Sequence, residues 1–209
     1  MMTSNPEISY IVSTFHRTTV LHLCLASIAA QKHRDFEVLV TDNSIRLSAI
    51  HENRKLVRSF GKNFRYLHTA PKLKVSDCYW SSELGVAEAH GRWISFPCDD
   101  CIYPDYYTRF MLTSAAEHGW NLVLSGNAIL GPETDGCRQY RHFRCGAQWP
   151  GNKASFLIER ELFLKLGGWR DKPKTSNSYA GIDTSNLRRW IQHPGVLFGH
   201  CPQLWYFHN

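Results

Sequence analysis

The sequence predicts an α/β fold in which a mostly parallel central sheet carries helices on both faces. Over the first half of the chain, short apolar runs alternate with stretches of helical period, the pattern of a covered parallel sheet. The chain has 209 residues, 43% of them hydrophobic, and no composition shift or Pro/Ser-rich linker divides it. This length and composition suit a single domain with its own buried core.

The elements of the first half can be placed in order from these runs. We expect strands at residues 8–13, 36–41, 64–67, 92–97 and 121–125. We expect helices through Leu21, Leu25 and Ile28, then over 49–60 and 75–89, and from Pro104, a residue that suits a first helical turn.

The second half is less regular. Residues 131–150 indicate a loop or hairpin, and a strand at 156–158 leads into a helix over 159–166. The Ser/Asn/Tyr/Gly-rich stretch at 175–181 is expected to be mobile, and a helix is expected over 182–192. Two short strands, at 196–198 and 204–207, are expected to close the fold.

Charge and cysteine content narrow the class of protein. The formal net charge of +6, from 24 basic and 18 acidic residues, favours anionic partners such as nucleotides, phosphorylated acceptors or nucleic acid. The seven cysteines are scattered, the N-terminus lacks the pattern of a signal peptide, and no stretch approaches the roughly 20 apolar residues of a membrane helix. We therefore expect a cytoplasmic protein without a transmembrane segment.

Polar clusters follow three of the expected strands, at residues 14–17, at residues 42–44 and at Asp99-Asp100. Ligands of parallel sheets bind at the carboxyl ends of the strands, so these clusters are candidates for one site. Two adjacent carboxylates suit Mg²⁺ or Mn²⁺, which prefer oxygen ligands and could neutralise a diphosphate leaving group. The alternative is a solvated turn before Pro104.

The runs at residues 6–17, 25–31, 35–44 and 85–96, the last leading into Asp99-Asp100, resemble family 2 glycosyltransferases of the GT-A fold. The resemblance covers residues 6–110 well and the remainder loosely. It implies inverting transfer of a sugar from a nucleoside-diphosphate sugar, typically a UDP-sugar, to an acceptor hydroxyl, with Mn²⁺ or Mg²⁺. It also implies a single GT-A domain over 1–209, with a nucleotide-sugar-binding half at 1–125 and an acceptor-binding half at 126–209.

The same resemblance implies roles for individual residues. The residues implied to bind the nucleotide and donor are Thr14, His16, Arg17, Asp42 and Asp99. Of these, Asp42 would accept a hydrogen bond from the base, and Asp99 would lie near the ribose and sugar. Asp100 matches the last acid of the family's Asp-x-Asp motif and is the expected metal ligand.

Two departures from the family pattern affect the donor site. Cys98 stands where many members carry the first acid of the motif, which leaves the ion fewer acidic ligands. Ser82 and Glu83 stand where many members carry an Arg-Asn pair, so a contact to phosphate or sugar is expected to change.

Three further residues are assigned in the second half. Asp183 resembles the catalytic Asp that takes the acceptor proton, although an Asp at this place could simply cap the helix. His208 resembles a His that touches the metal or the diphosphate; the alternative is a frayed chain end. Trp169 resembles an aromatic residue at the acceptor site, but it could equally belong to the core.

Other functions are less favoured by the residues. Cys98 and Cys101 have the spacing of a zinc pair, but only Cys137, Cys145 and His142 could complete it.

The basic and aromatic residues at 138–144 could contact a nucleic acid. The acceptor could be a glycan or, less favoured, hydroxymethylated DNA. Residues 13–17 lack the glycines of sugar nucleotidyltransferases. A degenerate nucleotide- or nucleic-acid-binding module without transferase activity is the main alternative.

Overall fold

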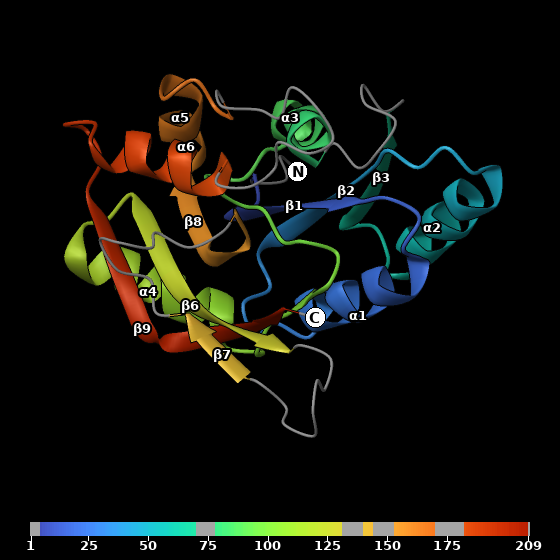
Figure 1. The fold of residues 1–209 in the computed structure, drawn as a ribbon, viewed down its shortest axis with the longest axis horizontal. Coiled ribbons are helices and arrows are strands. Elements are labelled where there is room, and N and C mark those ends of the chain that lie inside the picture. Colours follow the sequence, from blue (N-terminus) through green and yellow to red (C-terminus); the bar gives the residue numbers. More distant parts are fainter. Residues whose placement is uncertain (1–4, 70–77, 131–139, 144–152, 170–181, 209) are drawn as a thin grey trace.

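A computed structural model describes residues 5–69, 78–130, 140–143, 153–169 and 182–208 of the chain. One sheet runs through the whole molecule (Figure 1). Its strands, in spatial order, are β3 (Phe64–His68), β2 (Phe36–Asp42), β1 (Ile8–Thr14), β4 (Trp93–Ser95), β8 (Phe156–Glu159), β6 (Leu122–Leu130), β9 (Phe198–His208) and β5 (Cys101–Ile102), with β7 (Tyr140–Phe143) paired to β6.

The directions of the strands divide the sheet. Strands β3, β2, β1 and β4 are mutually parallel, which confirms the parallel arrangement predicted for the first half. Strand β8 lies antiparallel between β4 and β6, so it reverses the direction in the middle of the sheet. Because of this reversal, residues just before β8 lie at the same edge of the sheet as residues just after β4.

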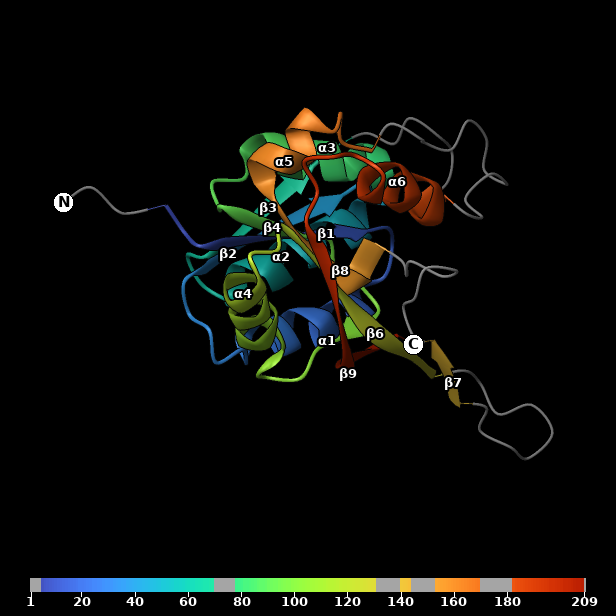
Figure 2. The same cartoon turned by 90° about the vertical axis from the view of Figure 1, so that its left-hand side faces the viewer.

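Helices cover both faces of the sheet, as predicted (Figures 1 and 2). One face carries α1 (Thr18–Ala29), α2 (Leu47–Ser59) and α4 (Tyr107–His118). The other carries α3 (Cys78–Glu88), α5 (Arg160–Lys165) and α6 (Ile182–Ile191). A single 3₁₀ turn, η1 (Lys153–Ser155), precedes β8.

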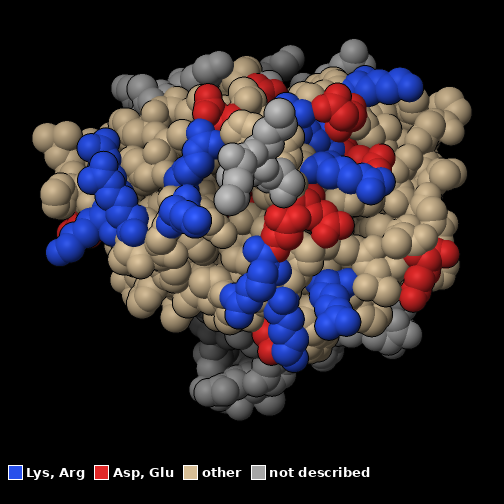
Figure 3. Space-filling view, turned by 180° about the vertical axis from the view of Figure 1, so that it is seen from behind, with Lys and Arg blue, Asp and Glu red and all other residues tan. Residues whose placement is uncertain are grey.

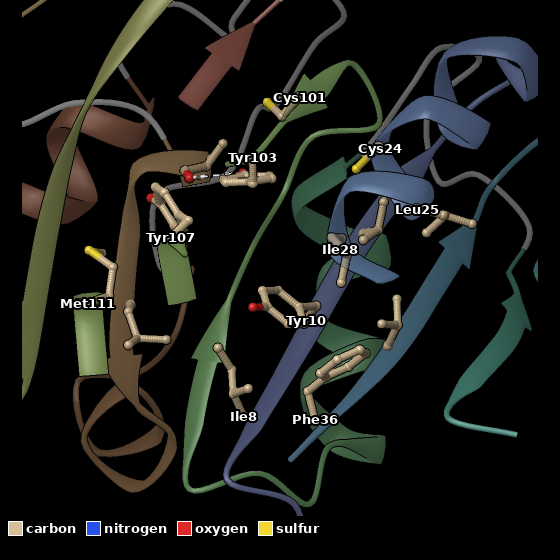
Figure 4. Close-up of a cluster of buried hydrophobic side chains, with 14 of the residues drawn as sticks. Ile8, Tyr10, Cys24, Leu25, Ile28, Phe36, Cys101, Tyr103, Tyr107 and Met111 are labelled. Carbon is tan, nitrogen blue, oxygen red and sulfur yellow. Dashed lines mark hydrogen bonds between the residues drawn. The ribbon is translucent and has the colours of Figure 1, made fainter. Parts of the chain in front are cut away.

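The core on the first face is built by the alternation of side chains along the strands. Tyr10 of β1 and Phe36 of β2 point to this face, where Leu25 and Ile28 of α1 cover them (Figure 4). Ile11, the next residue of β1, points to the opposite face. Both faces are therefore buried, which accounts for the nearly continuous apolar runs in the sequence.

The core on the second face is rich in aromatic rings. These rings pack edge-on or tilted, with centroids 5.0–5.8 Å apart, and belong to Phe96, Phe156, Phe163, Trp169 and Trp190. They bind α5 and α6 to the sheet, since each of these helices contributes rings to the same cluster.

The end of the chain differs from the prediction. The two short strands expected at 196–198 and 204–207 form one strand, β9, which follows β6 in parallel. The pairing shifts between Ser125 and Gly126, so that Cys201 and Trp205 pair with consecutive residues of β6. The chain takes up the extra residues, including Pro202, at this irregularity, which is why the sequence resembles two strands with a break.

Two other predictions can be compared with the described residues. The loop or hairpin expected at 131–150 contains β7, which pairs antiparallel with β6 as one arm of a hairpin. The stretch at 175–181 lies outside the described residues.

None of the described helices has the length and apolar character needed to cross a membrane. Basic and acidic side chains are interspersed on the face seen in Figure 3.

Candidate active site

A cavity of about 220 Å³ opens at the carboxyl ends of β1 and β4. It is lined by Ser13, Thr14, Phe15, Arg17, Cys78, Cys98, Asp99, Asp100 and Lys153. The fold thus brings together two of the polar clusters predicted at strand ends, residues 14–17 and Asp99-Asp100. We refer to this cavity as the acidic pocket.

Arg17 holds the two carboxylates of the acidic pocket. Its Nη1 donates to Asp99 Oδ1 at 3.1 Å, and its Nη2 donates to Asp100 Oδ2 at 2.7 Å. The Thr14 hydroxyl donates to Asp99 Oδ2 at 2.8 Å. Burial raises the pKa of Asp99 to about 6, although Arg17 and the Thr14 hydrogen bond oppose this rise. Asp99 can therefore change its charge in slightly acidic solution.

Asp100 has the surroundings expected of a metal ligand. A carboxylate oxygen of Asp100 and the Sγ atoms of Cys98 and Cys101 lie within 4.8 Å of one another. One carboxylate can hold Mg²⁺ or Mn²⁺ when substrate phosphates supply further oxygens, so Asp100 fits such an ion. The two sulfurs make the donor set softer than an all-oxygen site.

The backbone of His208 lies close to this group. Strands β5 and β9 pair antiparallel with His208 opposite Cys101, the residue that follows Asp100. The side chain of His208 lies outside the described part of the structure. The zinc alternative rested on Cys137 and Cys145, which also lie outside the described residues.

Asp42 lies at the end of β2 but does not line the acidic pocket. Its side chain is fully buried and accepts hydrogen bonds from the Ser44 backbone N–H at 2.8 Å, from Asn53 at 3.0 Å and from the Tyr66 hydroxyl at 2.8 Å. The carboxylate thus fixes the loop after β2. Because Asp42 is 0% exposed, a direct hydrogen bond to a nucleobase would require the residues that cover it to move.

His16 adopts a left-handed backbone conformation, with φ at 59°, and turns toward the same loop. Its backbone N–H donates to Ser44 Oγ at 2.8 Å, and Arg46 Nε lies 3.3 Å from its Nδ1. Burial and the neighbouring charge of Arg46 lower the pKa of the imidazole, which favours the neutral ring. The structure therefore places His16 beside the 42–46 loop, whereas Thr14 and Arg17 line the acidic pocket.

Asp183 lies in the first turn of α6 and interacts with the charge of Lys153, which lines the acidic pocket. It accepts a hydrogen bond from the Tyr79 hydroxyl at 2.6 Å and another from the Lys153 backbone N–H. Burial raises the pKa of Asp183, while these two hydrogen bonds and the charge of Lys153 oppose the rise. The carboxylate is held in a fixed orientation, which a proton acceptor requires.

Sequence reasoning missed Lys153 and Cys78 as residues of the acidic pocket. Lys153 is only 3% exposed, although a lysine between a Gly-rich stretch and an apolar run is ordinarily a surface residue. It enters the pocket because β8 runs antiparallel to β4, so that η1 faces the loop after β4. The direction of β8 would have been needed to predict it.

Trp169 does not have the surroundings predicted for an acceptor contact. It is 0% exposed and packs against Phe96, Phe163 and Trp190 in the aromatic core. No face of its ring is open to stack on a sugar, because the apolar cluster that joins α5 and α6 to the sheet covers it. The structure therefore corrects this assignment in favour of the core alternative.

A single mixed sheet between two helical layers, with an acidic pocket at the carboxyl edge of its parallel half, defines the GT-A class of glycosyltransferases. Comparison with known families agrees: residues 9–172 match the model of Glycosyl transferase family 2. The chain belongs to glycosyl transferase family 2. No curated protein matched the chain.

Solved structures of S. aureus TarS share this fold. TarS 1-349 aligns with a TM-score of 0.74 and 12% identity, covering 97% of this chain and 60% of TarS 1-349. TarS 1-349 in complex with UDP-GlcNAc aligns with a TM-score of 0.71 and 13% identity, covering 96% of this chain and 58% of the other. The chain thus spans less than two thirds of the proteins that it resembles.

Proposed function

We propose that this domain transfers a sugar from a nucleoside-diphosphate sugar, UDP-linked in the first instance, to an acceptor hydroxyl with inversion. The observation that carries this proposal is the acidic pocket, in which Thr14, Arg17 and the Asp99-Asp100 pair meet at the strand ends of a family 2 domain. The UDP-GlcNAc and UDP complexes of the structurally similar TarS support the choice of nucleotide.

In this proposal residues 1–125 bind the donor. Thr14 and Arg17 position the nucleotide beside Asp99, which faces the ribose and sugar. Asp42 and His16 act at the base through the loop that they hold, since both are bonded to residues 44–46. Arg17 spans both acidic residues and would exchange part of this pairing when an anionic donor enters.

We propose Mn²⁺ or Mg²⁺ as the cofactor, held by Asp100 and the donor phosphates, with His208 as a further ligand. The spacing of Asp100 from the two sulfurs and the pairing of His208 with Cys101 support this set. The ion would supply positive charge to the departing nucleoside diphosphate.

Asp183 is proposed as the base that takes the proton of the acceptor hydroxyl. Its raised pKa brings the carboxyl closer to the pH at which a general base is efficient, and Tyr79 orients it. The acceptor would bind to the half of the domain formed by residues 126–209, because α6, which carries Asp183, belongs to that half. A glycan hydroxyl is the first candidate for the acceptor, and hydroxymethylated DNA is the second.

The test combines binding with turnover. UDP plus Mn²⁺ should raise the melting temperature of the wild-type protein, and a panel of UDP-sugars and acceptors should give a product detectable by mass spectrometry. Asp183→Asn should keep the affinity for UDP within about threefold and lower turnover at least about a hundredfold, as expected on loss of a general base. A gel shift that weakens steeply with salt would show that the protein binds DNA through phosphate contacts, and a glycosylated DNA product would then identify DNA as the acceptor.

Two results would argue against the proposal. If no nucleoside diphosphate shifts the melting temperature with either ion, the acidic pocket is not a donor site. If the wild type and Asp183→Asn bind a UDP-sugar equally and neither hydrolyses nor transfers it, the chain is a nucleotide-binding module without transferase activity.

A further inference from the structure

Lys153 is a buried lysine of the acidic pocket for which the proposed reaction has no role so far. Its side chain lines the cavity, and it is 3% exposed. Lysine is rarely buried to this extent unless a partner compensates for the lost hydration of the ammonium group. The atoms around Nζ therefore indicate what the group is positioned to bind.

Neutral groups surround the ammonium most closely. Nζ lies 3.5 Å from Ser82 Oγ and 5.6 Å from the centre of the Tyr79 ring, and it is hydrogen-bonded to the Cys78 thiol. Burial raises the pKa of Cys78 to about 11, so this thiol is uncharged at pH 7. A hydroxyl, a thiol and an aromatic face all tolerate an ammonium group, but none of them neutralises its charge.

Two carboxylates lie near enough to Lys153 to interact with it. Asp183 and Asp99 both interact with its charge, one from α6 and the other from the loop after β4. Burial alone would lower the pKa of Lys153, but the neighbouring groups raise it overall, so the side chain stays protonated. Arg17, the other cation lining the acidic pocket, is already paired with Asp99 and Asp100.

The ammonium group of Lys153 lies beside Ser82 of α3. Ser82 is a buried, uncharged residue of α3 and brings no positive charge beside the acidic pocket. Lys153 reaches this residue from η1, with its Nζ 3.5 Å from Ser82 Oγ.

We propose that Lys153 binds the diphosphate of the nucleotide donor with a positive charge supplied from η1. This inference rests on the proposed function, because it takes the acidic pocket to be the donor site. It concerns binding by the protein itself and is independent of the metal. Lys153 would contact the phosphate oxygens, and Asp100 would hold the ion.

The experiment compares UDP with uridine, which lacks the phosphates, by titration calorimetry in Mn²⁺ and again in EDTA. Lys153→Met should weaken UDP binding about ten- to a hundredfold, as for the loss of a charge-assisted hydrogen bond in a buried site, and should leave uridine binding within about twofold. The weakening should persist in EDTA. Lys153→Arg, which keeps the charge, should restore most of the affinity.

Lys32→Met is the matched control, because Lys32 is an exposed lysine paired with Asp105 outside the acidic pocket. It should bind both ligands like the wild type. Circular dichroism and melting temperature establish that each variant is folded; if Lys153→Met is not, Lys153→Gln replaces it, since glutamine can still hydrogen-bond to Ser82.

Each outcome decides the proposal. If UDP and uridine are weakened equally, or if neither is, Lys153 only balances the charges of Asp183 and Asp99, and the inference is wrong while the proposed function stands. If the wild type binds no nucleoside diphosphate at all, the proposed function fails and the assignment of Lys153 fails with it.

Discussion

Burial and ion pairing shift the pKa of Asp99 in opposite directions. Its side chain is 5% exposed, and its folded-state pKa of about 6 lies above its ordinary value of 3.8. The folded state therefore binds this proton more tightly than the unfolded state does. The free energy of folding that this tighter proton binding contributes is fully present below about pH 4, and it is lost as the pH rises through 6.

Asp99→Asn should remove this pH dependence. Between pH 4 and pH 7, the wild type should lose on the order of 2–3 kcal/mol of unfolding free energy relative to the variant, because about two pKa units separate the two states. Urea unfolding of both proteins at several pH values measures this difference. Asn keeps an acceptor for the Thr14 hydroxyl but loses the charge that pairs with Arg17.

The matched control for this titration is Glu161→Gln, whose side chain is 83% exposed. Its stability should follow that of the wild type at every pH. A constant difference between Asp99→Asn and the wild type from pH 4 to pH 7 would show that Asp99 keeps its ordinary pKa in the folded protein.

At the scale of residues, the sequence predicted the members of the site that follow parallel strands. Thr14, Arg17 and the acidic pair could be placed because consecutive strand ends share one edge of a sheet. Lys153 could not, because its place depends on β8 running antiparallel to its neighbours. Trp169 was assigned to the acceptor by family resemblance, and only the packing of the surrounding rings shows that it is buried.

At the scale of elements, the contact between α3 and β1 sets one wall of the acidic pocket. A Cβ at Gly85 would lie 2.4 Å from Ile11 Cγ2 and 3.1 Å from Thr41 Cγ2, so the helix can approach the sheet only with glycine at this position. Ser82, one turn earlier in α3, donates or accepts a hydrogen bond with Ser13 Oγ at 2.8 Å. The depth at which α3 packs thus determines where Ser82 and Cys78 lie.

Gly85→Ala should push α3 away from the sheet. We expect a loss of about 1–3 kcal/mol in the free energy of unfolding, as for overpacking of a dense core. UDP affinity should fall as well, because Cys78, which lines the acidic pocket, moves with the helix. Chemical denaturation and calorimetric titration measure the two effects separately.

Gly195→Ala serves as the comparison, since its new Cβ would meet only the His193 ring, at 3.3 Å and beyond. A change within about 0.5 kcal/mol is expected at this site. Equal effects of the two substitutions would mean that the close approach of α3 is not what limits residue size at Gly85.

The elements that the sequence predicted well are those whose own residues carry the whole pattern, without reference to a neighbouring strand. The runs that became β1 and β2 are mostly apolar because both faces of these strands are buried, and this signal needs no knowledge of the partner strand. Strand β5 was not predicted, because two residues carry no periodicity and Cys101 is held there by pairing with β9. Strand β9 was divided in two because Pro202 interrupts its pattern.

At the scale of the whole molecule, the two halves of the chain share one sheet. Strand β8 from the second half lies between β4 of the first half and β6, which spans the boundary between the halves, and aromatic rings of Phe96 and Trp190 meet in one cluster. Neither half can keep its core when the other unfolds, because each supplies strands between those of the other.

The molecule should therefore unfold in a single step in urea. Tryptophan fluorescence, which reports on the aromatic core around Trp169 and Trp190, and far-ultraviolet circular dichroism should give the same midpoint. Saturating UDP should move both midpoints upward together, since a ligand stabilises the state that it binds. Two separate transitions would indicate that residues 1–125 and 126–209 are independent units.

The position of β9 has a consequence for the synthesis of the protein. Strand β9 pairs with β6 along its length and with β5 beside the acidic loop, so residues 198–208 complete the sheet. Until the ribosome has released them, β6 presents an open edge to other chains in the cell, a state prone to aggregation. A nascent chain arrested before residue 198 would be a substrate for chaperones even though its first four parallel strands are already made.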